Sequence, residues 1–278
     1  MRILITGPTG QLGRELIRVL EEEELLLLTH KVIDIRDTKL IQRIVDLKPN
    51  IIIHTAANTD VDECERYPES AFQVNTLGTR HVILGAEKVG AKLIYISTDY
   101  VFNGEKNVPY VESDEICPIN VYGRSKLMGE YLVQESSIPW IIVRTAWLYG
   151  EGRKNFITSV VEWARYLPVL KLVIDKTGSP TYAKDLALAI RHLIRAEACG
   201  TYNAASQGAC TWFEYGQYIL KILKTEKEVV PIAFDDLNRP AKRPAYSALS
   251  SDALKQSGFE MRDWRAALED FMSNRLLR

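Results

Sequence analysis

The sequence predicts an α/β fold, in which a Rossmann-type doubly wound parallel sheet is joined to a smaller C-terminal substrate-binding lid domain. Three observations lead to this prediction. Short apolar runs alternate with longer amphipathic stretches through the first half of the chain. The runs are almost continuously hydrophobic, which is typical of parallel strands that helices cover on both faces. Three glycines directly follow the first run, at the turn where doubly wound folds bind nucleotides.

The elements of the predicted sheet follow one another in a regular order. Five strands are predicted, at residues 2–6, 25–29, 51–55, 92–97 and 140–144. Helices are predicted between them, at residues 11–24, 38–47, 71–89 and 122–136. Residues 103–120 are rich in Pro, Gly, Asp and Asn, and we expect them to form a loop.

The alternation becomes less regular after Trp147, and three prolines within residues 231–244 interrupt it further. A last helix is predicted at residues 264–277. We expect residues 1–146 to form an NAD(P)-binding Rossmann domain, which elements from residues 168–200 complete. Residues 147–278 are expected to form mainly a substrate-binding lid.

Composition and charge exclude several classes of protein. Lys and Arg number 35 against 36 Asp and Glu, so the net charge is −1, whereas nucleic-acid-binding chains normally show a basic excess. The apolar runs are about strand length, far short of the roughly 20 residues that span a bilayer. The chain starts directly in a predicted strand, which leaves no room for a signal peptide. We therefore expect a cytoplasmic protein without nucleic-acid or membrane partners.

Gly7, Gly10 and Gly13 stand between the first strand and the first helix. In a dinucleotide-binding turn, the first glycine permits the tight turn and the second lets the pyrophosphate approach the backbone. The third lets the helix pack closely on the strand. The helix N-terminus adds unpaired N–H groups and a partial positive charge. Together with Gln11 and Leu12, these glycines predict a dinucleotide-binding loop, and an ordinary glycine-rich turn is the alternative.

The end of the second strand indicates which cofactor is used. A site selective for NAD places an acidic residue there, against the ribose 2′-hydroxyl. Here the strand is followed by His30 and Lys31, which could face a 2′-phosphate. NADPH is therefore the expected cofactor, with NADH as a possible substitute. His30 could equally be an ordinary exposed turn residue.

Tyr122 and Lys126 are four residues apart in a predicted helix, so their side chains share one face. A free tyrosine has a pKa near 10 and exchanges protons poorly at neutral pH. A neighbouring ammonium group favours the phenolate and lowers that pKa. Reaching a pKa of about 7 requires roughly 4 kcal/mol of differential stabilisation. The pair is a candidate for proton transfer, although such pairs also occur by chance on surface helices.

Ser97, Thr98 and Asp99 stand at the end of the fourth predicted strand. The carboxyl ends of parallel strands are where doubly wound folds bind ligands. Thr98 could hydrogen-bond a substrate carbonyl while Tyr122 donates the proton. A capping or turn cluster is the alternative, but the glycine loop and the Tyr122–Lys126 pair favour catalysis.

These features resemble the extended short-chain dehydrogenase/reductase superfamily, whose members use a Ser or Thr, a Tyr and a Lys with NAD(P). More narrowly, the chain is similar to the dTDP-4-dehydrorhamnose reductase family over nearly its whole length. The similar segments are residues 6–13, 54–62, 97–102, 120–123, 144–147, 155–156, 178–181 and 239–247.

The resemblance implies that NAD(P)H reduces the 4-keto group of dTDP-4-dehydro-6-deoxy-L-mannose (dTDP-4-dehydrorhamnose) to give dTDP-L-rhamnose. It makes Thr98, Tyr122 and Lys126 the catalytic trio, with Tyr122 and Lys126 also at the cofactor. The further cofactor contacts that it implies are Asp34, Ile35, Ala56 and Ala57. The substrate contacts that it implies are Thr98, Asp99, Tyr100 and Trp147. Trp147 could alternatively be a core anchor, and Asp34 a helix or turn cap.

A basic cluster stands late in the chain, at Arg239, Lys242 and Arg243. It could reach the diphosphate of the substrate, or it could be an exposed basic loop. Some relatives bind a metal at a dimer interface through a glutamate at the position of Glu15. We find no partner carboxylates for it, so no metal is predicted and Glu15 is expected to be a solvated first-turn residue. A homodimer is expected.

Two alternative functions stay open. The first is another nucleotide-sugar reductase or an epimerase; dehydration is disfavoured, because dehydratases follow the threonine with Asp-Glu and here Asp99 precedes Tyr100. The second is a non-catalytic NADP-binding regulatory subunit that resembles the β subunit of methionine adenosyltransferase. The intact Thr98, Tyr122 and Lys126 argue against a purely regulatory role.

Overall fold

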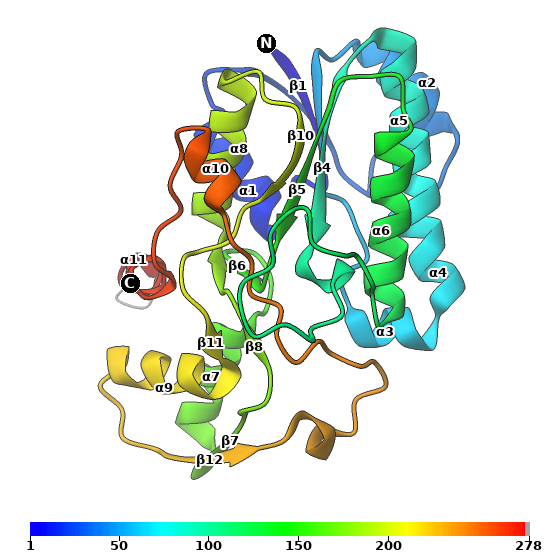
Figure 1. Ribbon diagram of the computed structural model, residues 1–278. Coiled ribbons are helices and arrows are strands. Elements are labelled where there is room, and N and C mark those ends of the chain that lie inside the picture. Colours follow the sequence, from blue (N-terminus) through cyan, green and yellow to red (C-terminus); the bar gives the residue numbers. More distant parts are fainter. Residues whose placement is uncertain (276–278) are drawn as a thin grey trace.

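The computed structural model describes residues 1–275, and their central feature is a six-stranded parallel sheet (Figure 1). The strands lie in the order β2-β1-β3-β4-β5-β10. Their bounds are β1 (Arg2–Thr6), β2 (Glu24–Leu28), β3 (Ile51–His54), β4 (Lys92–Thr98), β5 (Trp140–Thr145) and β10 (Gly200–Asn203). The order reverses between β1 and β3, and ligands of doubly wound sheets bind beside such a reversal, at the carboxyl ends of the strands. The predicted fold class is confirmed.

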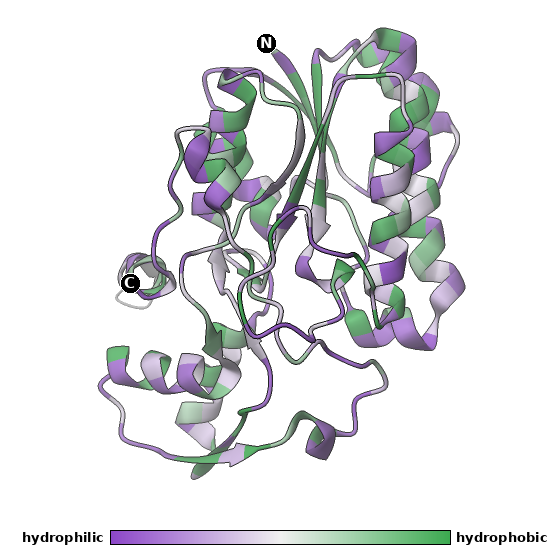
Figure 2. Ribbon diagram, in the orientation of Figure 1, coloured by the Kyte–Doolittle hydropathy of each residue, from purple (hydrophilic) through white to green (hydrophobic). Residues whose placement is uncertain are grey.

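Helices cover both faces of this sheet (Figure 1). Those on one face are α1 (Gln11–Val19) and α8 (Ala183–Arg195), and those on the other are α2 (Lys39–Leu47), α5 (Gly78–Val89) and α6 (Val121–Gln134). Ile3 and Ile5 pack toward α1 and α8, whereas Leu4 packs toward α2 and α5, because successive side chains of a strand face opposite ways. All three are fully buried. This two-sided burial explains the continuous hydrophobic runs, which colour the strands green in Figure 2.

Several boundaries differ from the sequence prediction. The first helix ends at Val19 rather than at residue 24, because the chain already enters β2 at Glu24. The helix predicted at residues 71–89 is divided into α4 (Pro68–Phe72), the π-helix η1 (Gln73–Leu77) and α5. An additional helix, α3 (Val61–Arg66), begins where the Asp60 side chain accepts a hydrogen bond from the Glu63 N–H.

The second half of the chain contributes both to the sheet and to a lobe at its carboxyl end (Figure 1). Within residues 168–200, α8 packs on the sheet, and β10 then adds beside β5. β7 (Val169–Val173) instead pairs with β12 (Glu228–Ile232) in the lobe. The remaining elements are η2 (Asp99–Val101), β6 (Leu148–Tyr149), α7 (Phe156–Tyr166), β8 (Thr177–Gly178), β9 (Thr181–Tyr182), β11 (Cys210–Thr211), α9 (Trp212–Ile222), η3 (Phe234–Leu237), α10 (Asp252–Gln256) and α11 (Trp264–Arg275). The domain division after residue 146 stays a prediction.

An aromatic core holds the lobe together. Tyr149, Tyr215, Trp264 and Phe271 are buried in one cluster, to which α7, α9 and α11 contribute. The rings of Tyr149 and Tyr182 stack with their centroids 5.5 Å apart. The last predicted helix is present as α11, and its predicted extension to residue 277 lies outside the described residues. Up to residue 275, the structure has no helix that is both long and apolar enough to cross a membrane.

Candidate active site

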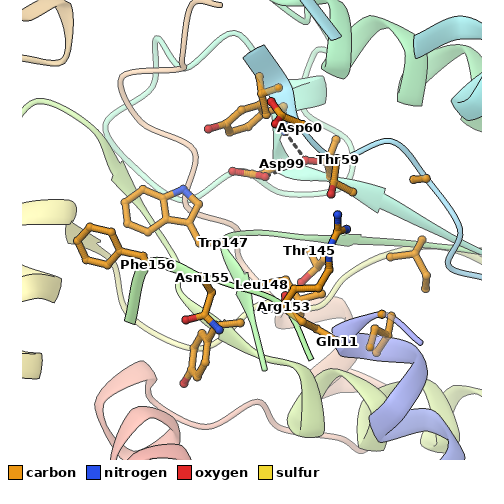
Figure 3. A pocket seen from close by; sticks show the side chains of 18 of the residues that line it. Gln11, Thr59, Asp60, Asp99, Thr145, Trp147, Leu148, Arg153, Asn155 and Phe156 are labelled. Atoms are coloured by element: carbon orange, nitrogen blue, oxygen red, sulfur yellow. Dashed lines mark hydrogen bonds between the residues drawn. The ribbon is translucent and has the colours of Figure 1, made fainter. Parts of the chain in front are cut away.

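A cavity of about 520 Å³ lies at the carboxyl end of the sheet, between the sheet and the lobe. The glycine loop and the ends of β4 and β5 form one side of it, and residues of α7 and α9 form the other. Figure 3 shows side chains from both halves of the chain converging on this space. The cavity therefore lies where the reversal of strand order places a ligand.

Two positions of the glycine loop have no room for a side chain. Gly7 has φ +68°, and a Cβ there would lie 2.9 Å from Thr55 Oγ1. A Cβ on Gly13 would lie only 2.4 Å from the Gly7 carbonyl oxygen. Gly10 is the N-cap of α1, and Gly10, Gln11, Leu12 and Gly13 line the cavity. The N-terminus of a helix, where N–H groups lack partners within the helix, fits the diphosphate of a dinucleotide.

The predicted adenine contacts do not line this cavity. Asp34 is bound by the Arg36 guanidinium, with Nη2 2.6 Å from Oδ2 and Nε 3.1 Å from Oδ1. These hydrogen bonds lower the pKa of Asp34 to about 2. His30 Nδ1 lies 3.6 Å from the same carboxylate, and both His30 and Lys31 are exposed. Arg36 therefore neutralises the nearest carboxylate beyond β2, a contact that the Asp-x-Arg spacing could have suggested.

The remaining predicted cofactor contacts lie close to the glycine loop or its neighbours. Ala57 lines the cavity, whereas the Ala56 N–H donates to Thr6 Oγ1 at 3.3 Å. Ile35 packs beside Gly78, where a Cβ would lie 2.8 Å from its Cδ1 atom. Ala56 and Ile35 are thus not part of the described cavity lining.

Thr98, Tyr122 and Lys126 all line the same cavity. Thr98 ends β4, and the other two side chains come from the first turns of α6. Asn120 caps α6, because its Oδ1 accepts a hydrogen bond from the Gly123 N–H at 2.8 Å. The structure therefore brings together three residues that lie in two separate sequence segments.

The protonation of this trio differs from the sequence hypothesis. Burial raises the pKa of the Tyr122 phenol above its usual value, and the Thr98 hydroxyl only partly opposes that rise. Burial also lowers the pKa of Lys126 to about 7, and Glu130 opposes that change. Lys126 is not among the groups that lower the Tyr122 pKa here, because its amine is itself desolvated and only partly charged at neutral pH. The joint effect of Lys126 and a nicotinamide ring on that pKa stays a prediction.

The Lys126 amine is held against an aromatic ring. Its Nζ lies 4.0 Å from the centroid of Tyr95, a distance typical of a cation–π contact. The Tyr95 hydroxyl in turn donates to the Lys126 carbonyl oxygen at 3.1 Å. Tyr95 therefore fixes both ends of this residue beside the cavity.

Asp99 and Tyr100 follow Thr98 into the cavity lining. Asp99 is 2% exposed, and burial raises its pKa to about 7. Thr98 Oγ1 donates to Asp99 Oδ1 at 3.0 Å, and within residues 1–275 the other carboxylate oxygen has no hydrogen-bond partner. The ring of Tyr100 meets that of Tyr122 edge-on, with centroids 6.0 Å apart. Asp99 is thus a buried carboxyl at the cavity, and the hydroxyls of Ser247 and Thr98 only partly oppose the rise in its pKa.

An aromatic wall closes the lobe side of the cavity. Trp147 has φ +44°, and its indole stacks on that of Trp212 with centroids 3.7 Å apart and planes 8° from parallel. A Cβ on Gly178 would lie 2.4 Å from the Trp147 indole, so this arrangement requires the glycine. Phe156 packs against Trp212, with centroids 4.5 Å apart. Trp212 was not predicted from the sequence, because its contact with Trp147 spans 65 residues.

Two buried networks that the sequence analysis missed support the trio. On the π-helix η1, Asn75 Nδ2 donates to Ser125 Oγ at 2.9 Å and its Oδ1 accepts from the Asn58 N–H at 2.8 Å. Arg144 forms a bidentate pair with Glu130, at 3.0 and 2.7 Å, and both side chains are almost fully buried. These contacts tie α6 to β5 and to the loop after β3.

Two charged residues, Arg239 and Glu15, form ion pairs with other residues of the chain. Arg239 is absent from the described cavity lining; its Nη1 lies 3.4 Å from Asp62 Oδ2, and Arg243 Nη1 lies 3.0 Å from Asp62 Oδ1. Glu15 is not solvated as expected, because it is 3% exposed and pairs with Arg18 Nη1 at 2.6 Å. Tertiary packing, which the first-turn position does not reveal, buries this carboxylate.

Comparison with known proteins identifies the family. Residues 1–276 match the family model described as the RmlD substrate binding domain. The chain belongs to this family. It is 36% identical over 277 residues to the spore coat polysaccharide biosynthesis protein SpsK of Bacillus subtilis (strain 168), covering 99% of this chain and 98% of SpsK.

Two solved structures of this family are very similar to the chain. One is a dTDP-4-dehydrorhamnose reductase from Clostridium acetobutylicum, with a TM-score of 0.97, 35% identity and full coverage of both chains. The other is the Bacillus anthracis dTDP-4-dehydrorhamnose reductase in complex with NADP, with a TM-score of 0.95 and 38% identity over 98% of this chain and 99% of that one. The predicted resemblance is confirmed, and the chain is an enzyme of an NAD(P)H-dependent dTDP-sugar reductase family.

Proposed function

We propose that this enzyme reduces the 4-keto group of dTDP-4-dehydrorhamnose with NADPH to give dTDP-L-rhamnose. The observation that carries the proposal is the meeting of Thr98, Tyr122 and Lys126 in one cavity with the glycine loop. The two similar structures named as dTDP-4-dehydrorhamnose reductases support the choice of substrate.

The cofactor would lie at the carboxyl end of the sheet, where the strand order reverses between β1 and β3. Its diphosphate would be held by Gly7, Gly10, Gln11, Leu12 and Gly13. Ala56 and Ala57 would lie beside the part of the cofactor that leads from the diphosphate to the nicotinamide. Asp34 and Ile35 would lie at the adenine, and His30 and Lys31 at a 2′-phosphate. NADPH is preferred in this proposal because Arg36 already neutralises Asp34. The bound nicotinamide supplies the hydride to the ketone carbon.

Residues of this chain would supply the proton that the substrate oxygen takes up. Burial keeps the Tyr122 phenol protonated at neutral pH, so it can act as an acid. An alkoxide is a much stronger base than a phenolate, so the proton moves to the substrate oxygen as negative charge develops there. The Thr98 hydroxyl, which donates to Asp99 Oδ1 in the structure, would turn to donate a second hydrogen bond to that oxygen. Lys126, with a pKa of about 7, then stabilises the phenolate and would hold the nicotinamide ribose.

The lobe would act as the lid over the nucleotide-sugar, as part of residues 147–278. Asp99, Tyr100 and Trp147 would contact the sugar, and the Asp99 side chain would have to turn for its buried, unpartnered oxygen to accept from a sugar hydroxyl. Arg239 would have to leave Asp62 to reach the diphosphate of the substrate. A homodimer also belongs to the proposal, and sedimentation velocity tests it.

The deciding experiment offers purified enzyme and NADPH a panel of dTDP- and UDP-linked 4-keto sugars. The proposal predicts that dTDP-4-dehydrorhamnose bleaches the reduced-nicotinamide absorbance fastest, and that NMR identifies dTDP-L-rhamnose as the product. Faster turnover of another sugar would identify that sugar as the substrate in place of dTDP-4-dehydrorhamnose. NADPH binding without oxidation by any sugar would favour the regulatory-subunit alternative.

A further inference from the structure

Arg153 is a cation at the cavity without a partner in the described structure. It belongs to the loop at residues 150–155, between β6 and α7, and it lines the cavity. Figure 3 shows its side chain extending from that loop into the space beside Gln11 and Thr145. Within residues 1–275 its guanidinium has neither a hydrogen bond nor an ion pair with a carboxylate closer than 4 Å.

The other basic side chains near this place are already engaged. Lys126 is buried against Tyr95 and is only partly charged at neutral pH. Lys154 pairs with Glu162 at 2.6 Å, and Arg14 Nε donates to the Thr9 carbonyl oxygen at 3.1 Å. The glycine loop at residues 7–13 contains no basic residue. Three basic side chains line the cavity, Lys126, Arg153 and Lys154. Among them Arg153 alone offers a diphosphate group a full charge that no described carboxylate neutralises.

The loop that carries Arg153 is seated on α1, the helix whose N-terminus faces the cavity. Gln11 Nε2 donates to the Gly150 carbonyl oxygen at 3.3 Å. Arg18 Nη2 pairs with Glu151, and Gly152 (φ +96°) lies where a Cβ would be 2.4 Å from Arg14 Nε. These contacts hold the loop backbone beside the N-terminus of α1, and the exposed Arg153 side chain extends from that loop.

We propose that Arg153 binds the diphosphate group of a ligand in this cavity, opposite the N-terminus of α1. This inference rests on the proposed function, because both a pyridine dinucleotide and a nucleotide-sugar carry a diphosphate. A guanidinium presents paired donors that match two phosphate oxygens, and the charge-assisted bonds are about twice as strong as neutral ones. The lobe would thus be closed over the sheet by an ionic contact to the ligand.

The test measures binding of NADP⁺ and of dTDP, each alone, by calorimetry. Arg153→Gln is expected to lower the affinity for one or both ligands by about 10- to 100-fold, the range for hydrogen bonds to a charged group. The ligand whose affinity falls identifies which diphosphate Arg153 contacts. Arg153→Lys should recover part of the loss, and the wild-type affinity should fall more steeply with added NaCl than that of Arg153→Gln.

Arg165→Gln is the matched control, since Arg165 is an exposed cation of α7 that does not line the cavity. It should bind both ligands as the wild type does, and thermal unfolding of all three variants should match the wild type. Affinities of Arg153→Gln within twofold of the wild type for both ligands would overturn the inference and leave the proposed function intact. A wild-type enzyme that binds neither NADP⁺ nor dTDP would overturn the proposed function, and the inference with it.

Discussion

The Tyr122 phenol is the side chain on which the proposed proton transfer depends. Replacing it with phenylalanine removes the proton but keeps the ring that packs edge-on against Tyr100. We expect Tyr122→Phe to lower kcat by about 10²- to 10⁴-fold, the usual contribution of a general acid to the rate. NADPH should still bind, which quenching of intrinsic fluorescence can measure. Turnover close to wild type would reject Tyr122 as the acid.

The buried carboxyl of Asp99 leads to a prediction about stability, which can be tested without substrate. Its pKa rises from 3.8 in the unfolded chain to about 7 in the fold, so folding favours the protonated form. Its contribution is complete below pH 3.8 and is lost as the pH rises through about 7. Asp99→Asn removes this dependence, and we expect it to raise the free energy of unfolding by about 1–3 kcal/mol at pH 8.

Urea unfolding of the wild type and Asp99→Asn at pH 4 and pH 8 checks this expectation. The gain of the variant should be present at pH 8 and nearly absent at pH 4. Equal gains at both pH values would show that the carboxyl does not titrate as described. Asp99→Asn should also bind the sugar substrate less well if the free oxygen accepts from a hydroxyl.

At the scale of the element, helix α6 carries two of the three catalytic candidates, and Asn120 begins it. Asn120→Ala removes the cap and the hydrogen bond from Nδ2 to the Lys242 carbonyl oxygen. We expect a loss of about 1 kcal/mol in the free energy of unfolding and a lower kcat, because the first turn holds Tyr122. Asn120→Ser keeps an accepting cap oxygen without placing a second acceptor against the Lys242 carbonyl oxygen, and should restore part of both. Failure of the serine to recover any kcat would contradict a positioning role.

The turn between β1 and α1 allows a paired test of fold and cofactor binding. Gly13→Ala forces a Cβ to within 2.4 Å of a backbone oxygen, so we expect a loss of about 1–3 kcal/mol in stability. A Cβ on Gly10 meets only the Gly7 oxygen, at 3.3 Å. Gly10→Ala should therefore unfold like the wild type but bind NADP⁺ more weakly, since its methyl group occupies the approach of the diphosphate.

Calorimetry with NADP⁺ and thermal unfolding of both variants distinguish these effects. Unchanged NADP⁺ affinity in a folded Gly10→Ala variant would move the diphosphate away from this turn. An unchanged unfolding temperature for Gly13→Ala would contradict the close packing of helix on strand.

At the scale of the whole molecule, local signals in the sequence predicted the sheet well. Ile3, Leu4 and Ile5 face both sides of the sheet, so β1 reads as one apolar run, and the glycines mark the turn that follows. Tyr122 and Lys126 could be paired because a helix repeats every 3.6 residues. Information within a few residues of the chain was sufficient for these features.

Features that depend on distant contacts could not be predicted. The π-helix η1 interrupts an otherwise helical pattern where Asn75 bonds to Ser125, fifty residues later. Burial of Glu15 and the lowered pKa of Lys126 arise from tertiary packing, which local sequence does not contain. The stacking of Trp212 on Trp147 likewise depends on how the lobe folds back over the sheet.

A crystal structure of the enzyme with bound NADP⁺ tests the central claim most directly. The account predicts the diphosphate on the glycine loop, with Tyr122 Oη facing the reactive carbon of the nicotinamide and Lys126 Nζ within hydrogen-bond distance of its ribose. A nicotinamide ring that lies elsewhere, with Tyr122 and Lys126 directed away from it, would contradict the account.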